Sequence, residues 1–128
     1  KKHFNKLEKN KKEEFLRISS GNLPENFSDK LLQIKNKFFE NSKPIATRKS
    51  SEACLEEITK FMPELIGGSA DLTGSNNTKS SIQKIIKTNN FDGSYIHYGI
   101  REHGMCGIMN GLAFEGENCF GKTSILKK

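Results

Sequence analysis

The chain has 128 residues, a hydrophobic content of 34% and a formal net charge of +6. That length supplies one modest core, and no run approaches the roughly 20 apolar residues that a membrane-spanning helix needs. The three cysteines are an odd number without CxxC spacing and form no ligand pattern with the three histidines, so we expect no zinc site. These features favour a soluble protein of a reducing cytoplasm, with no membrane partner.

Positive charge is concentrated at the front of the chain, where six lysines precede Glu13 and Glu8 is the counter-charge. A lysine cluster can bind nucleic acid, but this one lacks regularly interleaved aromatic residues, glycine-arginine repeats and a recognisable reading helix. We interpret it as a solvated segment. A remnant that binds nucleic acid remains the less favoured alternative.

Two short helical patterns follow between residues 13 and 40, separated by Gly21-Asn22-Leu23-Pro24. In the second pattern, Ser28 stands where a helix N-cap is expected. An apolar face recurs there at helical spacing, formed by Leu31, Leu32, Ile34, Phe38 and Phe39. Such a face needs a packing partner.

Strand and helix patterns alternate through the rest of the chain. The expected elements are a helix over residues 47–61 ended by Pro63, a strand over 65–69, a short helix over 82–87, a strand over 95–98 and a helix over 102–114. This order predicts an α/β fold: a partial parallel sheet with flanking helices, preceded by a helical connector.

Residues 95–105 carry the clearest functional signal. Four strand-forming residues run into Gly99, and Arg101-Glu102 then opens a helix rich in small residues, so Glu102 is expected on the first helical turn at the carboxyl edge of the sheet. Open α/β sheets bind ligands beyond that edge, and a helix start favours an ionised carboxylate. Taken by itself, the segment fits an ordinary exposed first-turn glutamate better than a functional one.

A second segment strengthens the functional interpretation. Residues 65–76 form an apolar strand that ends in Gly67-Gly68 and continues into hydroxyls, an amide and Asp71. Together with Ala46-Thr47-Arg48-Lys49 upstream and the Glu102 segment downstream, this order closely resembles the pyrimidine-binding domain of transketolase, a thiamine diphosphate enzyme. The resemblance covers about residues 14–121. Dihydroxyacetone synthase would share the run over residues 67–76.

The resemblance implies the chemistry of the site. In transketolase a glutamate is hydrogen-bonded to the aminopyrimidine ring of thiamine diphosphate and helps the cofactor's own amino group take a proton. Glu102 matches that catalytic and cofactor-binding residue. Asp71 matches an aspartate near the thiazolium ring. Gly67, Gly68 and Ser69 are expected to let the backbone approach a ligand or a partner closely, and Gly68 and Ser69 are assigned to the cofactor site. The implied reaction moves a two-carbon glycolaldehyde unit from a ketose phosphate to an aldose phosphate, in the pentose phosphate pathway.

The resemblance also assigns substrate contacts. Arg48 and Ser75 match the arginine and serine that bind the phosphate of sugar phosphates. A guanidinium binds phosphate in a fork, which favours Arg48 over the neighbouring Lys49. An ordinary cation at a helix start is the alternative for Arg48 on residue type alone.

The resemblance further implies what lies outside this sequence. The family holds magnesium and the diphosphate with a Gly-Asp-Gly motif in its first domain, which this sequence lacks. We therefore interpret residues 1–43 as the basic tail of that first domain and residues 44–128 as the start of the pyrimidine-binding domain, inactive alone. The helix with Gly104, Gly107 and Gly111 would suit close packing in a homodimer or against a complementing transketolase subunit.

A competing motif occurs near the end of the chain. Residues 116–123 fit the phosphate-loop pattern GxxxxGK[ST], whose backbone amides and lysine bind nucleotide phosphates. That loop must follow a strand and open a helix, whereas here a helix is expected before it and five residues follow it. We expect instead a turn into the next strand, with Lys122 departing from the family's glycine.

Overall fold

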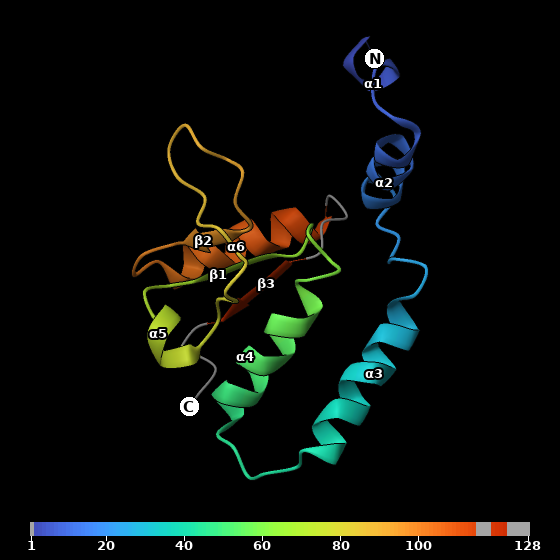
Figure 1. Ribbon diagram of the computed structural model, residues 1–128. Helices are drawn as coiled ribbons and strands as arrows, with labels where there is room; N and C mark the ends of the chain where they lie inside the picture. Colours follow the sequence, from blue (N-terminus) through green and yellow to red (C-terminus); the bar gives the residue numbers. More distant parts are fainter. Residues whose placement is uncertain (1, 115–118, 123–128) are drawn as a thin grey trace.

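The computed structural model describes residues 2–114 and 119–122 (Figure 1). The elements are, in chain order, α1 (Lys2–Asn5), α2 (Lys9–Ser19), α3 (Phe27–Glu40), α4 (Thr47–Ile58), β1 (Ile66–Ser69), α5 (Thr73–Asn76), β2 (Tyr95–His97), α6 (Glu102–Phe114) and β3 (Cys119–Lys122). The expected α/β architecture is confirmed: α2 and α3 precede a small parallel sheet that has helices on both sides.

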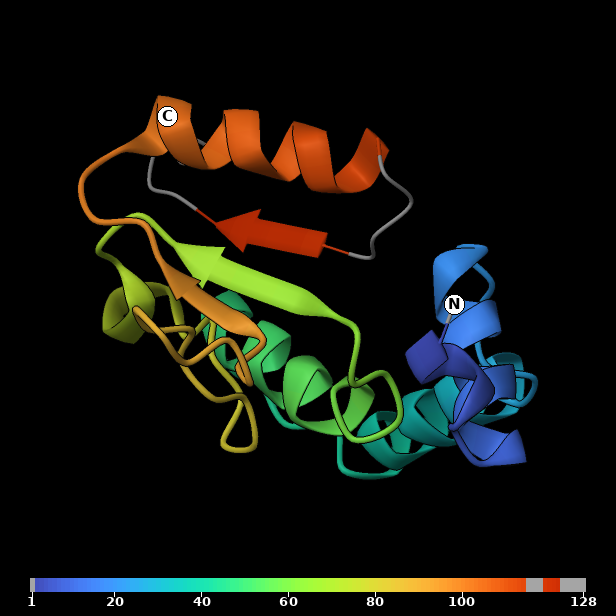
Figure 2. The ribbon, with the colours of Figure 1, turned by 90° about the horizontal axis from the view of Figure 1, so that it is seen from above.

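The sheet has the order β2-β1-β3, and both pairings are parallel. In the register, Gly68 of β1 lies opposite Ile96 of β2 and Gly121 of β3. Figure 2 shows the three arrowheads pointing the same way, with α6 on one side of the sheet and α4 on the other. Every strand therefore ends at one edge, where the segments leading to α5 and α6 emerge.

The face of the sheet toward α6 carries the apolar core. Ala70, Tyr98 and Met105 form a buried cluster, against which Ile96 and Met109 pack. Strand alternation explains the arrangement, because Ile96 and Tyr98 are two residues apart and share one face. The neighbouring residue Tyr95 is completely buried on the opposite face.

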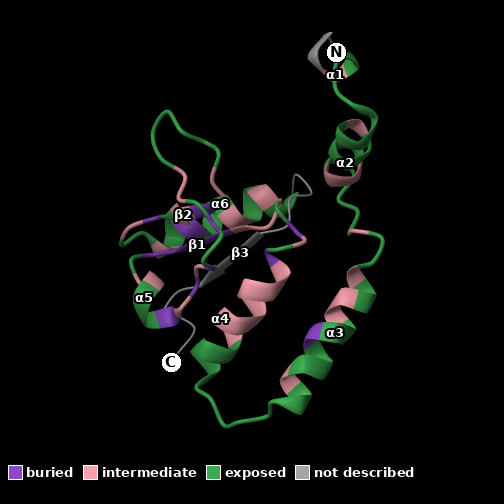
Figure 3. Ribbon diagram, in the orientation of Figure 1, coloured by how far each residue is buried: buried purple, intermediate pink, exposed green. Residues whose placement is uncertain are grey.

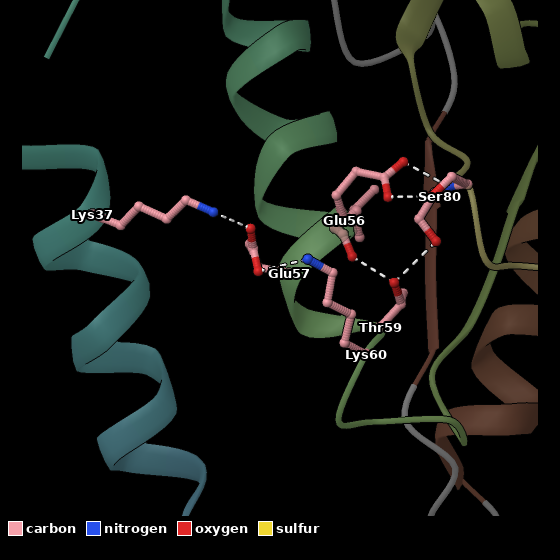
Figure 4. Close-up of polar contacts among 8 residues, drawn as sticks. Lys37, Glu56, Glu57, Thr59, Lys60 and Ser80 are labelled. Atoms are coloured by element: carbon pink, nitrogen blue, oxygen red, sulfur yellow. Dashed lines mark hydrogen bonds and ion pairs between the residues drawn. The ribbon is translucent and has the colours of Figure 1, made fainter. Parts of the chain in front are cut away.

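Polar contacts fasten α4 to the segment that follows α5 (Figure 4). The Thr59 hydroxyl at the end of α4 donates to the Leu55 carbonyl oxygen at 2.7 Å and lies 2.9 Å from the buried Ser80 hydroxyl. One turn earlier, the Glu56 carboxylate accepts from the backbone N–H and hydroxyl of Ser81 at 2.6 and 2.7 Å. These bonds hold the return segment after β1 against α4.

The prediction of a helix over residues 82–87 is wrong. Ile85 instead makes an isolated parallel bridge to Tyr95, and the Ile86 N–H donates to the Tyr95 carbonyl oxygen at 2.8 Å. The Lys84 carbonyl oxygen accepts from the N–H of Tyr95 at 3.1 Å. The free edge of β2 offers these backbone partners, and β-branched residues suit extended chain better than helix.

Other expected boundaries shift by a few residues. Helix α4 ends at Ile58 and not at residue 61, although Pro63 follows shortly as expected. Ser28 is not the N-cap of α3, because the helix already begins at Phe27, and no side-chain bond from Asn26 caps it. The next strand, β3, follows α6 in the described part of the chain and occupies residues 119–122, where the sequence predicts a turn into that strand.

The N-terminal helices contact the rest of the chain through charged and aromatic side chains. Arg17 of α2 pairs with Glu64, just before β1, at 2.9 Å between Nη1 and Oε1, and with Glu14 at 2.6 Å. The Glu64 side chain is only 4% exposed, against 15% for Arg17. The hydrogen bonds that Arg17 donates to Glu14, and its contact with the Glu64 carboxylate, raise the pKa of Arg17, so the guanidinium stays charged.

Helix α3 contacts α4 and the turn after it. The Phe27 and Phe61 rings meet edge to face at 6.0 Å between centroids, and the Lys37 ammonium pairs with Glu57 of α4 (Figure 4). Of the expected apolar face of α3, Ile34 is buried, whereas Phe39 is 82% exposed. Figure 3 shows α2 and α3 mostly exposed. The expected face is therefore only partly covered within the described chain.

Among the described residues, no helix is both long and apolar enough to cross a membrane.

We predict that Arg17→Leu lowers the free energy of unfolding by about 3 kcal/mol, because it leaves the Glu64 carboxylate buried without its cation. The double variant Arg17→Leu/Glu64→Leu should recover most of that loss. Urea unfolding measures both, with the exposed Arg48→Leu as the matched control, expected within about 0.5 kcal/mol of wild type. An equal loss in the single and double variants would contradict the pairing.

We predict that the contribution of Glu57 to stability depends on pH. Hydrogen bonds from Lys37 and then Lys60 hold the pKa of Glu57 below its usual 4.5, so its contribution is present above pH 4.5 and is lost as pH falls through the folded-state value. Both lysines are largely exposed, so the effect is at most about 1 kcal/mol. Urea unfolding should separate wild type from Glu57→Gln at pH 7, and the gap should narrow as pH is lowered from 4.5. A gap that stays constant as pH falls would rule out this origin.

Candidate functional site

The candidate residues lie on or next to β1, α4, α5 and α6, around the carboxyl edge of the sheet. Gly68 and Ser69 end β1, Asp71 follows at once, and Ser75 lies in α5. Glu102 begins α6, which β2 reaches through the turn over residues 98–101. Because β1 and β2 are parallel neighbours, the two segments emerge side by side, as Figure 2 shows. Topology therefore gathers residues that are far apart in the sequence.

Glu102 is the first residue of α6 and is half-buried. The turn before it is held by Arg101, whose N–H donates to the Gly99 carbonyl oxygen at 2.8 Å and whose guanidinium donates to the Tyr98 carbonyl oxygen at 3.1 Å. Gly99 has φ +67°, a conformation that glycine adopts readily. The Glu102 carboxylate has no hydrogen-bond or ion-pair partner among the described residues, so it is available to a ligand.

Asp71 and Ser69 differ in what their side chains do. Ser69 is completely buried, and its hydroxyl accepts the Leu72 N–H at 3.1 Å, which stabilises the turn into α5. Asp71 is exposed and has φ +60°, the left-handed region that non-glycine residues seldom occupy. Such strain concentrates at functional sites. Ser69 thus shapes the turn, and that turn presents Asp71.

Gly68 leaves room for groups of this chain. A Cβ there would stand 2.3 Å from Cε2 of Tyr98 and 2.7 Å from the Ile96 carbonyl oxygen. The sequence prediction explained this glycine by close approach of a ligand. In the structure, the missing side chain admits the Tyr98 ring that packs beneath α6.

Arg48 and Ser75 are exposed, and neither side chain has a partner in the described part of the chain. Arg48 is the second residue of α4, whose start lies toward the end of the sheet where the strands finish (Figures 1 and 2). Ser75 lies within α5 at that same end. Helix α4, which carries Arg48, lies on the opposite side of the sheet to α6, which begins at Glu102.

The structure contradicts the phosphate-loop alternative, because part of that motif forms strand β3. Residues 119–122 pair with β1 in a parallel ladder, and an extended strand cannot form the anion-binding turn of a phosphate loop. The turn expected there is thus corrected to β3 itself, whereas residues 116–118 and 123 lie outside the described residues. Over residues 4–114, no cluster of three metal-binding side chains occurs.

Sequence reasoning missed a buried chain of hydroxyl groups beneath α5. The Tyr95 hydroxyl lies 2.5 Å from the Thr78 hydroxyl and 3.0 Å from that of Thr73, which in turn lies 3.4 Å from Nδ1 of His97. A signal was present, because strand alternation puts Tyr95 and His97 on one face and a hydroxyl-rich segment follows β1. The burial of those hydroxyls could not be anticipated from composition.

The fold and the site together define an α/β domain with unpartnered carboxylates, among the described residues, beyond the carboxyl edge of parallel strands, the place where open α/β sheets bind ligands. Comparison with known proteins identifies it further. Residues 43–122 match the family described as transketolase, pyrimidine binding domain. The chain belongs to the transketolase family.

Curated relatives agree with this assignment. The plasmid transketolase of Cupriavidus necator is 46% identical over 105 residues, which is 81% of this chain and 15% of that protein. Transketolase 2 of Vibrio parahaemolyticus is 47% identical over 103 residues, 80% of this chain and 16% of that protein. The chain thus spans about a sixth of the length of these relatives.

Solved structures resemble this fold. Transketolase from Leishmania mexicana aligns with a TM-score of 0.66 and 37% identity, covering 85% of this chain and 16% of that one. A Pichia stipitis transketolase in complex with sedoheptulose-7-phosphate aligns with a TM-score of 0.68 and 36% identity, covering 89% and 17%.

We predict that Gly68→Ala destabilises the chain by about 1–3 kcal/mol, because the added methyl group overlaps the Tyr98 ring and the Ile96 carbonyl oxygen. Gly107→Ala is the matched control: it meets nothing within 4 Å and should stabilise α6 by about 0.5–1 kcal/mol. Urea unfolding measures both. A neutral Gly68→Ala would show that β1 and Tyr98 have room to separate.

Proposed function

We propose that this chain supplies the aminopyrimidine side of a thiamine diphosphate site and takes part in transketolase chemistry, the transfer of a two-carbon unit between sugar phosphates. The observation that carries the proposal is a half-buried, unpartnered carboxylate at the start of α6, beyond the carboxyl edge of a parallel sheet, in a chain of the transketolase family. Thiamine diphosphate, when bound, supplies the carbon nucleophile that carries the two-carbon unit.

The donor set suits the heterocyclic end of that cofactor. Glu102 can hold and exchange a proton with a ring nitrogen, because its carboxylate is shielded from water on one side and unpaired among the described residues. Asp71 would place negative charge near the cofactor's positive ring. Gly68 and Ser69 would form the backbone wall, since their own side-chain positions are filled by internal contacts.

The two exposed residues Arg48 and Ser75 suit a sugar-phosphate substrate. Arg48 and Ser75 are exposed at the same end of the sheet and would bind the phosphate of a ketose or aldose phosphate, Arg48 through its forked guanidinium. One relative supports the substrate class, because the Pichia stipitis structure contains sedoheptulose-7-phosphate.

We further propose that the chain is inactive alone and acts as a cytoplasmic module that needs a complementing transketolase segment or a second subunit. In this proposal residues 1–43 are the connector and residues 44–128 the pyrimidine-binding part. The magnesium and diphosphate would be held by the complementing segment.

The role of Glu102 can be tested in a hybrid enzyme, in which residues 43–122 of this chain replace the matching segment of the Vibrio parahaemolyticus transketolase. We predict that Glu102→Gln lowers kcat of this hybrid by about 10²–10⁴-fold, the usual contribution of a proton-transferring group. A coupled assay with ketose and aldose phosphates, magnesium and thiamine diphosphate measures the rate.

Asp92→Asn, an exposed carboxylate before β2, is the control and should leave the rate unchanged. A Glu102→Gln hybrid as active as its parent would remove Glu102 from the mechanism. Robust turnover by the chain alone would overturn the complementation part of the proposal and leave the role of Glu102 intact.

A further inference from the structure

Both ends of the segment over residues 73–78 lie within hydrogen-bond distance of one atom, the hydroxyl oxygen of Tyr95. Tyr95 is completely buried in β2, and its hydroxyl lies 3.0 Å from that of Thr73, the first residue of α5, and 2.5 Å from that of Thr78, just after α5. Thr78 is completely buried as well. The phenol therefore closes this segment into a loop anchored to the sheet.

The hydrogen bonds of the anchor are complementary. A phenol donates one hydrogen bond and accepts others, so Tyr95 can donate to one threonine hydroxyl and accept from the other. Nδ1 of His97 lies 3.4 Å from the Thr73 hydroxyl, at the exposed end of this chain of groups. Burial makes each partner important, because an unsatisfied hydroxyl in the interior costs more than the bond contributes.

The geometry of the loop needs such an anchor. Helix α5 is a single turn, too short to be stable by itself, and Asn77 follows it with φ +50°, in the left-handed region. Ser75 lies between the two anchored ends and is exposed. The position of its hydroxyl is thus set by where Tyr95 holds Thr73 and Thr78.

We propose that Tyr95 is a positioning residue for sugar-phosphate binding: its buried hydroxyl fixes both ends of residues 73–78 and so sets where Ser75 stands. The inference rests on the proposed function only in the role that it gives Ser75. The anchor itself rests on the distances around Tyr95. The two can therefore be tested separately.

The first measurement is amide hydrogen exchange on the full chain. Tyr95→Phe keeps the ring and removes the hydroxyl, so the amides of residues 73–78 should exchange faster by about tenfold, the effect of losing one or two buried hydrogen bonds. Tyr98→Phe, a buried tyrosine on the α6 face, is the matched control and should leave this segment unchanged. Thr78→Val should act like Tyr95→Phe, and Thr78→Ser should restore protection.

The second measurement is NMR titration of the full chain with sedoheptulose-7-phosphate as the probe. Tyr95→Phe and Ser75→Ala should each weaken binding several-fold, and the double variant should bind no more weakly than Ser75→Ala, because Tyr95 acts through Ser75. A residue that only stabilises the fold would give additive effects.

Unchanged exchange at residues 73–78 in Tyr95→Phe, or exchange that rises equally in β1 and α6, would overturn the anchor. Additive losses in the titration would overturn its positioning role. If Ser75→Ala binds the probe as wild type does, the phosphate role of Ser75 fails, and the exchange experiment still decides whether Tyr95 holds the loop.

Discussion

The parallel pairing of β1 between β2 and β3 is the constraint on which the rest of the structure depends. Gly67 donates its N–H to the Ser94 carbonyl oxygen, and the Ser69 carbonyl oxygen accepts from Tyr98, so β1 and β2 advance in step. Parallel strands finish at a common edge, and the chain must leave β1 and β2 there. A sheet paired antiparallel would send Glu102 and Asp71 to opposite ends.

Around that edge, the polar side chains divide into two groups. Ser69, Thr78 and Tyr95 are completely buried. The Ser69 hydroxyl accepts the Leu72 N–H and the Thr78 and Tyr95 hydroxyls pair with each other, so these side chains shape the backbone. Asp71 and Glu102, by contrast, have no side-chain partner among the described residues. A rigid interior that leaves outward carboxylates unpaired is the arrangement that ligand binding requires, because the groups are held in place without being neutralised.

The N-terminal helices are attached by a different kind of contact. Arg17 bridges α2 to Glu64, and α3 meets α4 through one aromatic pair and the Lys37–Glu57 ion pair. Ile34 is the one buried residue of these two helices, and α2 and α3 are mostly exposed (Figure 3). Such contacts orient α2 and α3 more than they bury them.

Local periodicity and motifs along the chain are enough to predict the α/β class, the strands around Gly68 and Ile96, the helix starting at Glu102 and the family. Packing in three dimensions, in contrast, decided that residues 82–87 are extended, because the outer edge of β2 supplies the hydrogen bonds that displace a helix. It also decided that Gly68 makes room for Tyr98 and that Tyr95 anchors both ends of α5. Those contacts join residues more than fifteen positions apart, and the packing that brings them together leaves no periodic mark in the sequence.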